Sequence, residues 1–509
     1  MSIQLTINDS GIEPAATDKR EVRRKLLWMV GVALALRLVA MAYLLPLQLA
    51  PDQRSAHWPF GYETGQIAAS IAEGHGFSSP LFANTGPTAW MTPVYPYIVA
   101  GVFQVFGVFT TASALVILTF NAITSALTCL PIFFFARRSF GAPFGERAGE
   151  WAGWIWAVFP YAIYWPMSRI WDTWLATLLL AILFCMALRL AETNRVREWI
   201  AFGALSGVAA LTDAVVLSVL PFLALWALWR NYKHMGAPAD SSDADIEPSS
   251  KEIAGSSAPF TDNGAGPAKT PRRRGAGKLL LCASACVLAT IIVVTPWFVR
   301  NYVVFHRFIP LRDVFPLALR VGNVGDQFNM ITLTMGPWES QSEWQKYQKL
   351  GELGYMQDVW GHATSYIADH PDQYVFGFLR RMLYIWSGFW YRVPKARYGY
   401  DPSPAMIFLY TLLSLLAFAG LRIAVRNKDQ AAPYAIVMIV FPIVYYGTSI
   451  EPWYRAPMDP ILIALAGYAI ASTSANSRPQ ILSRLIRRER PAEIPANGVA
   501  ETEVLAAEK

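Results

Sequence analysis

About ten long apolar stretches, separated by polar segments of which two are long, dominate this sequence of 509 residues. A helix needs about 20 apolar residues to cross a bilayer, whereas an outer-membrane barrel needs apolar residues that alternate with a period of two. Hydrophobic residues make up 54% of the chain and charged residues only 16%, against roughly 25% charged residues in a soluble domain. The sequence therefore predicts an all-α polytopic membrane protein and excludes a soluble enzyme.

The apolar stretches predict about ten transmembrane helices. They fall at 26–47, 111–136, 150–167, 172–191, 198–213, 214–230, 278–299, 404–425, 432–449 and 457–474. A further apolar stretch, 92–109, contains Pro93 and Pro96 near its start. A full span here would place the basic loop with Arg137, Arg138 and Arg147 outside, against the positive-inside bias, so we interpret this stretch as an interfacial or re-entrant segment on the outer side.

Basic residues cluster in the segments predicted to be cytoplasmic, which is the pattern that orients membrane proteins. The formal net charge of +7 belongs to these clusters, so no nucleic-acid partner is predicted. The predicted segments are a cytoplasmic tail (1–24), a transmembrane bundle (25–233) whose first outer loop is 50–110, a disordered cytoplasmic linker (234–277), a transmembrane helix (278–299), a small outer subdomain (300–402), C-terminal transmembrane helices (403–475) and a basic cytoplasmic tail (476–509).

The sequence contains no Walker A loop, dinucleotide fingerprint, zinc-binding spacing or Gly-x-Ser-x-Gly elbow. It also has no alternating strand and helix pattern of the kind that binds nucleotide sugars. A sugar donor for this chain would therefore be carried by a lipid. Arg37 lies near the middle of the first apolar stretch, where a charge is costly unless it is paired, and a structural pair with Asp213 would account for it.

The first candidate residue is Glu63, which follows Tyr62 in the first outer loop. It opens a short amphipathic segment in which Ile67 and Ile71 recur at helical spacing. A carboxylate at this place is suited to accept a proton from an attacking hydroxyl. The alternative is an acidic residue that only stabilises the start of a helix.

The remaining candidates are charged residues in the other predicted outer segments. Arg169 and Asp172 lie in a short turn between two spans, where they either serve the chemistry or simply pair and cap a helix. Arg300 and Arg455 lie at outer helix ends, although positive-inside bias keeps this side poor in arginine. Guanidinium binds phosphate through paired hydrogen bonds, so a lipid-linked phosphate is the predicted partner. The alternative is anchoring to ordinary lipid headgroups.

Several of these segments, taken in order, resemble a known family. They are Tyr62-Glu63 with Gly74-His75-Gly76-Phe77, Pro87-Thr88-Ala89-Trp90 with Pro93-Val94-Tyr95-Pro96, Pro296-Trp297 with Arg300-Asn301-Tyr302, Gly322-Asn323, and Tyr454-Arg455-Ala456-Pro457. The chain resembles bacterial glycosyltransferases of family 39, which have the GT-C fold and are related to the protein O-mannosyltransferases and the lipid A aminoarabinose transferase. The resemblance covers nearly all of 25–475.

The resemblance implies a GT-C-like bundle with amphipathic helices in the first outer loop. It also implies a multi-pass protein of the bacterial inner membrane whose active site faces the periplasm. The implied reaction moves a sugar from a polyprenyl-phosphate donor to an acceptor hydroxyl, with inversion. The resemblance implies Glu63 as catalytic base. The predicted site also has Asp172 as the next catalytic carboxylate and, as substrate-binding residues, Tyr62, His75, Tyr95, Arg169, Arg300, Asn301, Asn323, Tyr454 and Arg455.

Relatives often carry a basic residue before the Pro-x-Tyr stretch, where this chain has Met91-Thr92. The donor-phosphate contact is therefore expected at Arg300 or Arg455. No cofactor is predicted; a divalent metal is compatible with the chemistry, but no acidic pair is available to bind it. The partners are the lipid-linked donor, membrane lipids and an unspecified protein, lipid or glycan acceptor. Two alternatives are a glycan ligase or polymerase with a diphosphate-linked donor, and a lipid-sugar flippase or transporter.

Overall fold

The computed structural model describes residues 19–48, 60, 62–81, 83–235, 271–325, 335–338, 340–388 and 404–488. Most of the predicted linker, parts of both predicted tails and residues 389–403 lie outside these ranges. Over the described ranges, the only β-type contact is an isolated bridge between Ser78 and Pro87. The predicted all-α class is confirmed.

Twenty helical segments follow one another along the described residues. They are α1 (Lys19–Gln48), α2 (Tyr62–Ala72), α3 (Val94–Phe106), α4 (Thr111–Leu127), α5 (Cys129–Ser139), α6 (Gly145–Val158), α7 (Pro160–Ser168), α8 (Thr173–Leu190), α9 (Val196–Thr212), η2 (Ala214–Ser218), α10 (Leu220–Met235), α11 (Pro271–Phe305), α12 (Phe315–Asn323), α13 (Gln341–Asp369), α14 (Pro371–Ser387), α15 (Pro404–Arg426), α16 (Ala431–Val440), α17 (Ile443–Gly447), η4 (Pro452–Arg455) and α18 (Asp459–Arg488).

Each of the ten predicted spans coincides with a helix or with two consecutive helices. Six helical stretches of the described chain are long and apolar enough to cross a membrane: Lys19–Leu45, Thr111–Ser139, Thr173–Leu190, Ala214–Lys233, Ala276–Phe305 and Pro404–Arg426. The other predicted spans fall on shorter or broken helices, namely α6 with α7, α9, α16 with α17, and the Asp459–Thr473 part of α18. Proline accounts for part of this breakage, since Pro160 begins α7 and Pro442 separates α16 from α17.

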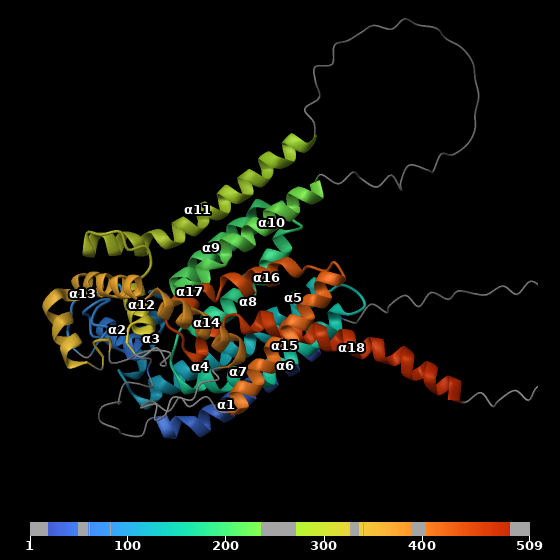
Figure 1. Ribbon diagram of the computed structural model, residues 1–509, viewed down its shortest axis with the longest axis horizontal. Coiled ribbons are helices and arrows are strands. Elements are labelled where there is room, and N and C mark those ends of the chain that lie inside the picture. Colours follow the sequence, from blue (N-terminus) through green and yellow to red (C-terminus); the bar gives the residue numbers. More distant parts are fainter. Residues whose placement is uncertain are drawn as a thin grey trace, which may run out of the picture.

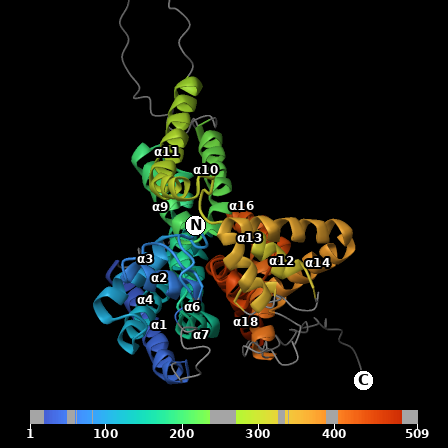
Figure 2. The same ribbon diagram turned by 90° about the vertical axis from the view of Figure 1, so that its left-hand side faces the viewer.

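Most of the helices share one large apolar interior, and α2, α3, α12 and α13 lie outside it and gather at one end of the bundle (Figure 1). A second apolar cluster joins these end segments, because Ile67 of α2, Trp90, Trp297 of α11 and Tyr355 of α13 are all buried in it. In the view of Figure 2, α9, α10 and α11 form a separate group of helices above α1 to α4. Long-range packing therefore brings the predicted first outer loop against the segment that follows α11.

Glycines permit the closest helix contacts in the bundle. A Cβ atom placed on Gly420 of α15 would lie 2.0 Å from the backbone oxygen of Leu465 in α18. A Cβ atom on Gly203 of α9 would lie 2.1 Å from the backbone oxygen of Cys286 in α11. Small residues serve this purpose in many membrane proteins, where close backbone approach replaces the hydrophobic driving force between helices.

Gly420→Ala is therefore expected to lower the stability of the folded protein by about 1–3 kcal/mol, the usual cost of overpacking. Gly31→Ala is the matched control, because no heavy atom lies within 4 Å of a Cβ at Gly31 of α1. Thermal unfolding in detergent measures both variants. Equal unfolding temperatures for the two variants would show that α15 and α18 do not depend on this contact.

The pair suggested between Arg37 and Asp213 is wrong. Arg37 is fully buried, and its Nε donates to Ser125 Oγ at 2.9 Å while its Nη1 donates to the carbonyl oxygens of Ala33 and Ala157 at 2.8 and 3.1 Å. The carboxylate of Asp213 instead accepts the backbone N–H of Val215 at 3.0 Å. Backbone carbonyls thus satisfy the buried guanidinium, which sequence patterns do not reveal.

Candidate active site

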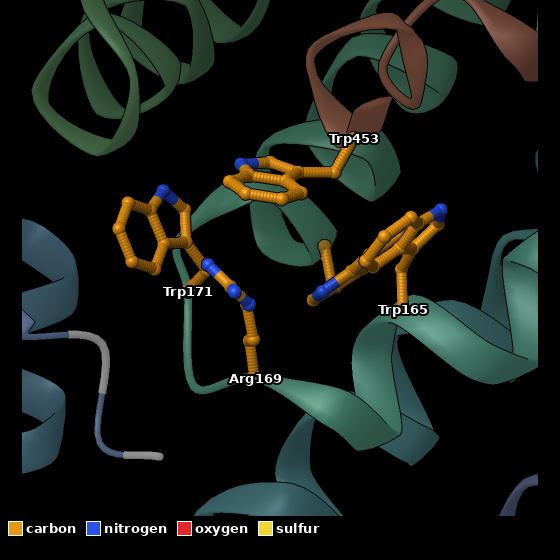
Figure 3. A pocket seen from close by; sticks show the side chains of 5 residues that line it. Trp165, Arg169, Trp171 and Trp453 are labelled. Carbon is orange, nitrogen blue, oxygen red and sulfur yellow. The ribbon is translucent and has the colours of Figure 1, made fainter. Parts of the chain in front are cut away.

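The turn between α7 and α8 carries Arg169, whose side chain is almost completely buried. Its guanidinium carbon lies 4.5 Å from the centre of the Trp453 ring, a favourable cation–π geometry. Figure 3 shows Arg169 among Trp165, Trp171 and Trp453. These side chains and Trp174 line a small, partly open pocket. Burial among aromatic rings fixes the direction in which Arg169 presents its charge.

A second layer of polar side chains holds this turn in place. Tyr95 of α3 is fully buried and donates its hydroxyl hydrogen bond to Asn121 Oδ1 of α4 at 2.8 Å. The Asn121 amide then donates to the carbonyl oxygens of Arg169 and Pro166, at 3.3 and 3.5 Å. Tyr95, predicted to bind substrate, therefore lies behind the turn, and Asn121 is a positioning residue that the sequence analysis missed.

Glu63 lies in the first turn of α2 and is partly buried. Burial raises the pKa of Glu63 to about 7, although its own backbone N–H and the positive charge of Arg169 favour the ionised form. The preceding residue, Tyr62, has a φ of 28°, which costs energy for a residue with a Cβ atom. This strained entry into α2 sets the position of Glu63.

Glu451 precedes η4 and influences Arg169 as well. Burial raises the pKa of Glu451 to about 7, and the charge of Arg169 opposes this rise. Arg169 thus interacts with two carboxyl groups, Glu63 and Glu451, that come from segments almost 400 residues apart in the chain. Glu451 was visible in the sequence as the first residue of the Glu-Pro-Trp-Tyr-Arg stretch, but no pattern there singled it out as a site residue.

A second group of charged residues adjoins the group formed by Arg169, Glu63 and Glu451. Burial and the negative charge of Asp213 raise the pKa of Asp172 to about 8, whereas the charge of Arg312 opposes the rise. Asp172 precedes α8, but its side chain makes no capping hydrogen bond there. Arg312 lies in the connection between α11 and α12 and is partly exposed. It forms no hydrogen bond or ion pair with any residue that the structure describes.

Tyr454 connects the two groups. Its ring stacks on Tyr445 with centroids 4.8 Å apart. Burial and the charge of Glu451 raise the pKa of Tyr454, and Arg312 opposes the rise, so the phenol remains protonated. We call the interacting residues the acid–arginine cluster; its members are Glu63, Arg169, Asp172, Asp213, Arg312, Glu451 and Tyr454.

Arg455 lies outside this cluster, although it follows Tyr454 directly. Its side chain is buried, and its Nε donates to Asp459 Oδ1 at 2.6 Å. Its Nη1 donates to the carbonyl oxygen of Ile385 at 2.8 Å and to Ser414 Oγ at 3.1 Å. The structure therefore gives Arg455 partners that join η4 to α14, α15 and α18.

Arg300 and Asn301 hold the first outer loop and the connection after α11. Arg300 Nη1 donates to the carbonyl oxygen of Thr88 and its Nη2 to that of Phe77, both at 2.7 Å. The Asn301 amide donates to the carbonyl oxygen of Ile309 at 3.0 Å and its Oδ1 accepts from Arg300 at 2.9 Å. Both residues thus join the first outer loop to the connection after α11, and their predicted contact with substrate stays a prediction.

The two remaining predicted site residues, Asn323 and His75, also lie apart from the acid–arginine cluster. Asn323 donates to the carbonyl oxygen of Gly447 at 3.0 Å and accepts from Arg381 at 2.7 Å, so it fastens α12 to α14 and α17. His75 is exposed beside Glu73, with His75 Nδ1 and Glu73 Oε2 3.6 Å apart. Across the residues that the structure describes, no three His, Cys, Asp or Glu side chains are placed to hold a metal ion.

One family model matches this chain. It is described as dolichyl-phosphate-mannose-protein mannosyltransferase and covers residues 90–237. The matched segment runs from the end of the first outer loop through α10, and it contains Tyr95, Asn121, Arg169, Asp172 and Asp213. No curated protein sequence matches the chain.

Solved structures to which this chain is similar include two oligosaccharyltransferase structures and one ArnT structure. AglB from Archaeoglobus fulgidus, in complex with an inhibitory peptide and a dolichol-phosphate, has a TM-score of 0.47 and 15% identity over 93% of this chain and 53% of that chain. The apo form of the Archaeoglobus fulgidus oligosaccharyltransferase has a TM-score of 0.49 and 13% identity over 92% and 52%. ArnT from Cupriavidus metallidurans, bound to undecaprenyl phosphate, has a TM-score of 0.36 and 14% identity over 94% and 82%.

This chain spans about half the length of the oligosaccharyltransferase chains. The family match, by contrast, covers the part of the chain that contributes the turn with Arg169 and Asp172. This family match agrees with the resemblance found in the sequence. Residues 90–237 are therefore similar to the dolichyl-phosphate-mannose-protein mannosyltransferase family, and the described part of the chain has six helical stretches long and apolar enough to cross a membrane.

Proposed function

We propose that this chain transfers a sugar from a polyprenyl-phosphate donor to an acceptor hydroxyl by a single displacement, with Glu63 as the general base. The observation that carries this proposal is the position of Glu63, a partly buried carboxyl group that interacts with Arg169. The description of the matched family names dolichyl phosphate mannose as a donor, which supports a polyprenyl-phosphate-linked sugar here.

A pKa of about 7 suits Glu63 to this role. A general base works best when its pKa is near the working pH, because it is then substantially ionised and still basic enough to take the proton. An ordinary glutamate, with a pKa of about 4.3, would be ionised at neutral pH but would be a much weaker base. Burial of Glu63 therefore strengthens the base, and Arg169 keeps a useful fraction of it charged.

Arg312 is the proposed contact for the donor phosphate. Its guanidinium is partly exposed and has no hydrogen-bond or ion-pair partner among the described residues, whereas Nη1 and Nη2 of Arg300 and Nε and Nη1 of Arg455 donate to protein oxygens. A guanidinium supplies several N–H donors in a plane that matches phosphate oxygens. We therefore assign to Arg312 the role expected from sequence at Arg300 or Arg455.

The proposed reaction step is a single displacement at the anomeric carbon of the donor sugar. The acceptor hydroxyl attacks the anomeric carbon and gives its proton to Glu63, while the bond between that carbon and the phosphate oxygen breaks. The electron pair of this bond stays on the polyprenyl phosphate, and Arg312 stabilises the negative charge that develops there. Stabilisation of this kind is worth several kcal/mol for a well-placed donor. Inversion at the anomeric carbon follows from attack opposite the leaving group.

We place the acid–arginine cluster on the outer face of the membrane, because the basic clusters mark the other side as cytoplasmic. A cysteine introduced at Ser340, which caps the start of α13, should react with an impermeant thiol reagent added from outside. A cysteine at Ser256, in the predicted cytoplasmic linker, should react only after the membrane is opened. The reverse pattern would place the cluster on the cytoplasmic side.

Reconstitution in liposomes tests the proposed function. Purified protein is incubated with radiolabelled polyprenyl-phosphate sugars and a membrane extract that supplies acceptors. Label in an acceptor, with release of polyprenyl phosphate, is the expected result. Label that crosses the bilayer while it remains on the lipid would instead identify a flippase, and transfer only from diphosphate-linked oligosaccharides would identify a glycan ligase or polymerase.

A further inference from the structure

A buried carboxyl group fastens the first outer loop to α13. Glu352 accepts three hydrogen bonds: from the Thr88 hydroxyl at 2.5 Å, from the Ala89 backbone N–H at 2.6 Å and from the Tyr347 hydroxyl at 3.1 Å. The side chain of Glu352 is nearly inaccessible to water. Three donors directed at one carboxyl group favour its ionised form.

A second carboxyl group, Asp313, lies against Glu352. No donor among the described residues reaches either of its side-chain oxygens, and both oxygens are shielded from water. The group in hydrogen-bonding contact with it is the carboxyl of Glu352. Two carboxylates in such contact repel each other strongly unless a proton lies between them. Since the three donors stabilise charge on Glu352, the proton resides on Asp313. The protonated Asp313 carboxyl then donates a hydrogen bond to Glu352.

The pair joins three segments that are far apart in the sequence. Asp313 is the residue after Arg312, and its backbone N–H donates to the carbonyl oxygen of Ala89 at 3.1 Å. Glu352 holds the hydroxyl of Thr88 and the N–H of Ala89, and it belongs to α13 just after a kink at Gly351, where φ is 66°. The connection after α11, the first outer loop and α13 thus meet at one buried pair.

We infer that Asp313 and Glu352 share one proton and that this protonated pair positions Arg312 for the donor phosphate, so that loss of the proton releases the first outer loop and weakens donor binding. The role given to Arg312 rests on the proposed function, whereas the shared proton and the release of the loop do not. Asp313 and Glu352 are positioning residues in this account.

The surrounding charges are compatible with one shared proton. Arg300 of α11 binds the carbonyl oxygen of Thr88, and Glu352 acts on Arg300 through its negative charge. Tyr347 of α13 faces both carboxyl groups as a phenol. Burial and the charge of Glu352 raise the pKa of Asp313 well above its ordinary value, and burial raises that of Glu352. An acid with a raised pKa loses its proton as the pH rises, so the loop is released on the alkaline side.

Amide hydrogen exchange on the full chain in liposomes tests the pair without any substrate. In the wild type, protection of the peptide that contains Ala89, corrected for the intrinsic rate, should fall about tenfold or more as the pH is raised from neutral into the alkaline range and the loop opens. Asp313→Asn keeps the shape and supplies a permanent amide donor to Glu352, so its protection should not depend on pH. Asp358→Asn is the matched control, because Asp358 also belongs to the α13 region but pairs with Lys346 at 2.5 Å.

The control variant should follow the wild type. Wild-type protection that is constant with pH, or a pH dependence that persists in Asp313→Asn, would overturn the shared proton. If Asp313→Asn does not fold, Glu352→Gln provides the second variant, because its amide group can donate to an ionised Asp313 while its oxygen accepts from Ala89. Its protection should likewise be constant with pH.

Donor kinetics then tests the link to Arg312. The donor KM of the wild type should rise about tenfold over the same alkaline range, and that of Asp313→Asn should stay constant. If exchange depends on pH as expected but the donor KM does not, the pair exists and does not position Arg312. If no transfer is detected at all, the proposed function fails, and the exchange result still decides whether the proton is shared.

Discussion

Glu63→Gln is expected to lower kcat by about 10²–10⁴-fold, the usual contribution of a general base, and to leave the donor KM nearly unchanged. Glutamine keeps the shape of glutamate but cannot accept the proton of the acceptor hydroxyl. An interaction made only in the transition state affects kcat without affecting ground-state binding. Steady-state kinetics on reconstituted protein, with the donor concentration varied, measures both parameters.

The pH dependence gives an independent check on the same residue. The pKa of Glu63 is raised to about 7, and only the ionised carboxylate accepts a proton, so kcat of the wild type should fall as the pH drops below about 7. The small residual rate of Glu63→Gln should lack this acidic limb. Glu73→Gln is the control, because Glu73 lies just after the same helix and is exposed; it should behave as the wild type.

Near-normal kcat in Glu63→Gln would mean that the base lies elsewhere in the acid–arginine cluster. Asp172 is then the next residue to substitute, since it is a buried carboxyl group of the same cluster with a pKa raised to about 8. A loss of kcat in Asp172→Asn together with a normal Glu63→Gln would transfer the role to Asp172.

Arg312→Ala is expected to raise the donor KM by about ten- to a hundredfold, which corresponds to the loss of a hydrogen bond to a charged group. The phosphate is present in the ground state and in the transition state, so kcat/KM should fall at least as much as the donor KM rises. Arg312→Lys should be intermediate, because lysine keeps the charge but loses the planar set of donors. Kinetics with the donor varied at saturating acceptor concentration measures the change.

Arg307→Ala is the matched control for Arg312→Ala. Arg307 lies in the same connection after α11 and is exposed, so its removal should leave the donor KM unchanged. An unchanged donor KM in Arg312→Ala would show that another group binds the phosphate; Arg169 would then be the remaining arginine of the cluster.

The apolar stretches were sufficient to predict the all-α class and the helices that lie in the ten predicted spans, because helix length and apolar composition are local properties of the sequence. The helices α12, α13 and α14 lie in the predicted outer subdomain, and their positions were not predicted individually. Glu63, Arg169 and Asp172 could also be singled out locally, since each lies beside a helix end in a polar segment. The structure places all three in one cluster. Their roles in catalysis stay predictions until the variants are measured.

Tyr454 was also predicted from sequence, but three other members of the cluster could not be assigned to the site by the same means. Arg312, Asp213 and Glu451 acquire their significance only from partners that lie far away in the sequence. The same limitation explains Arg300 and Arg455: both are arginines near helix ends, but their partners are carbonyl oxygens and Asp459 in the folded chain. Sequence spacing identifies an unusual charge and does not identify the group that satisfies it.

A donor labelled at two positions tests the central claim most directly. The sugar carries ¹⁴C and the phosphate carries ³²P, and the wild-type protein is supplied with this polyprenyl-phosphate sugar in liposomes. Displacement at the anomeric carbon predicts that ¹⁴C moves to the acceptor while ³²P remains on the lipid as polyprenyl phosphate. Movement of ³²P to the acceptor together with ¹⁴C, or no separation of the two labels, would contradict the account.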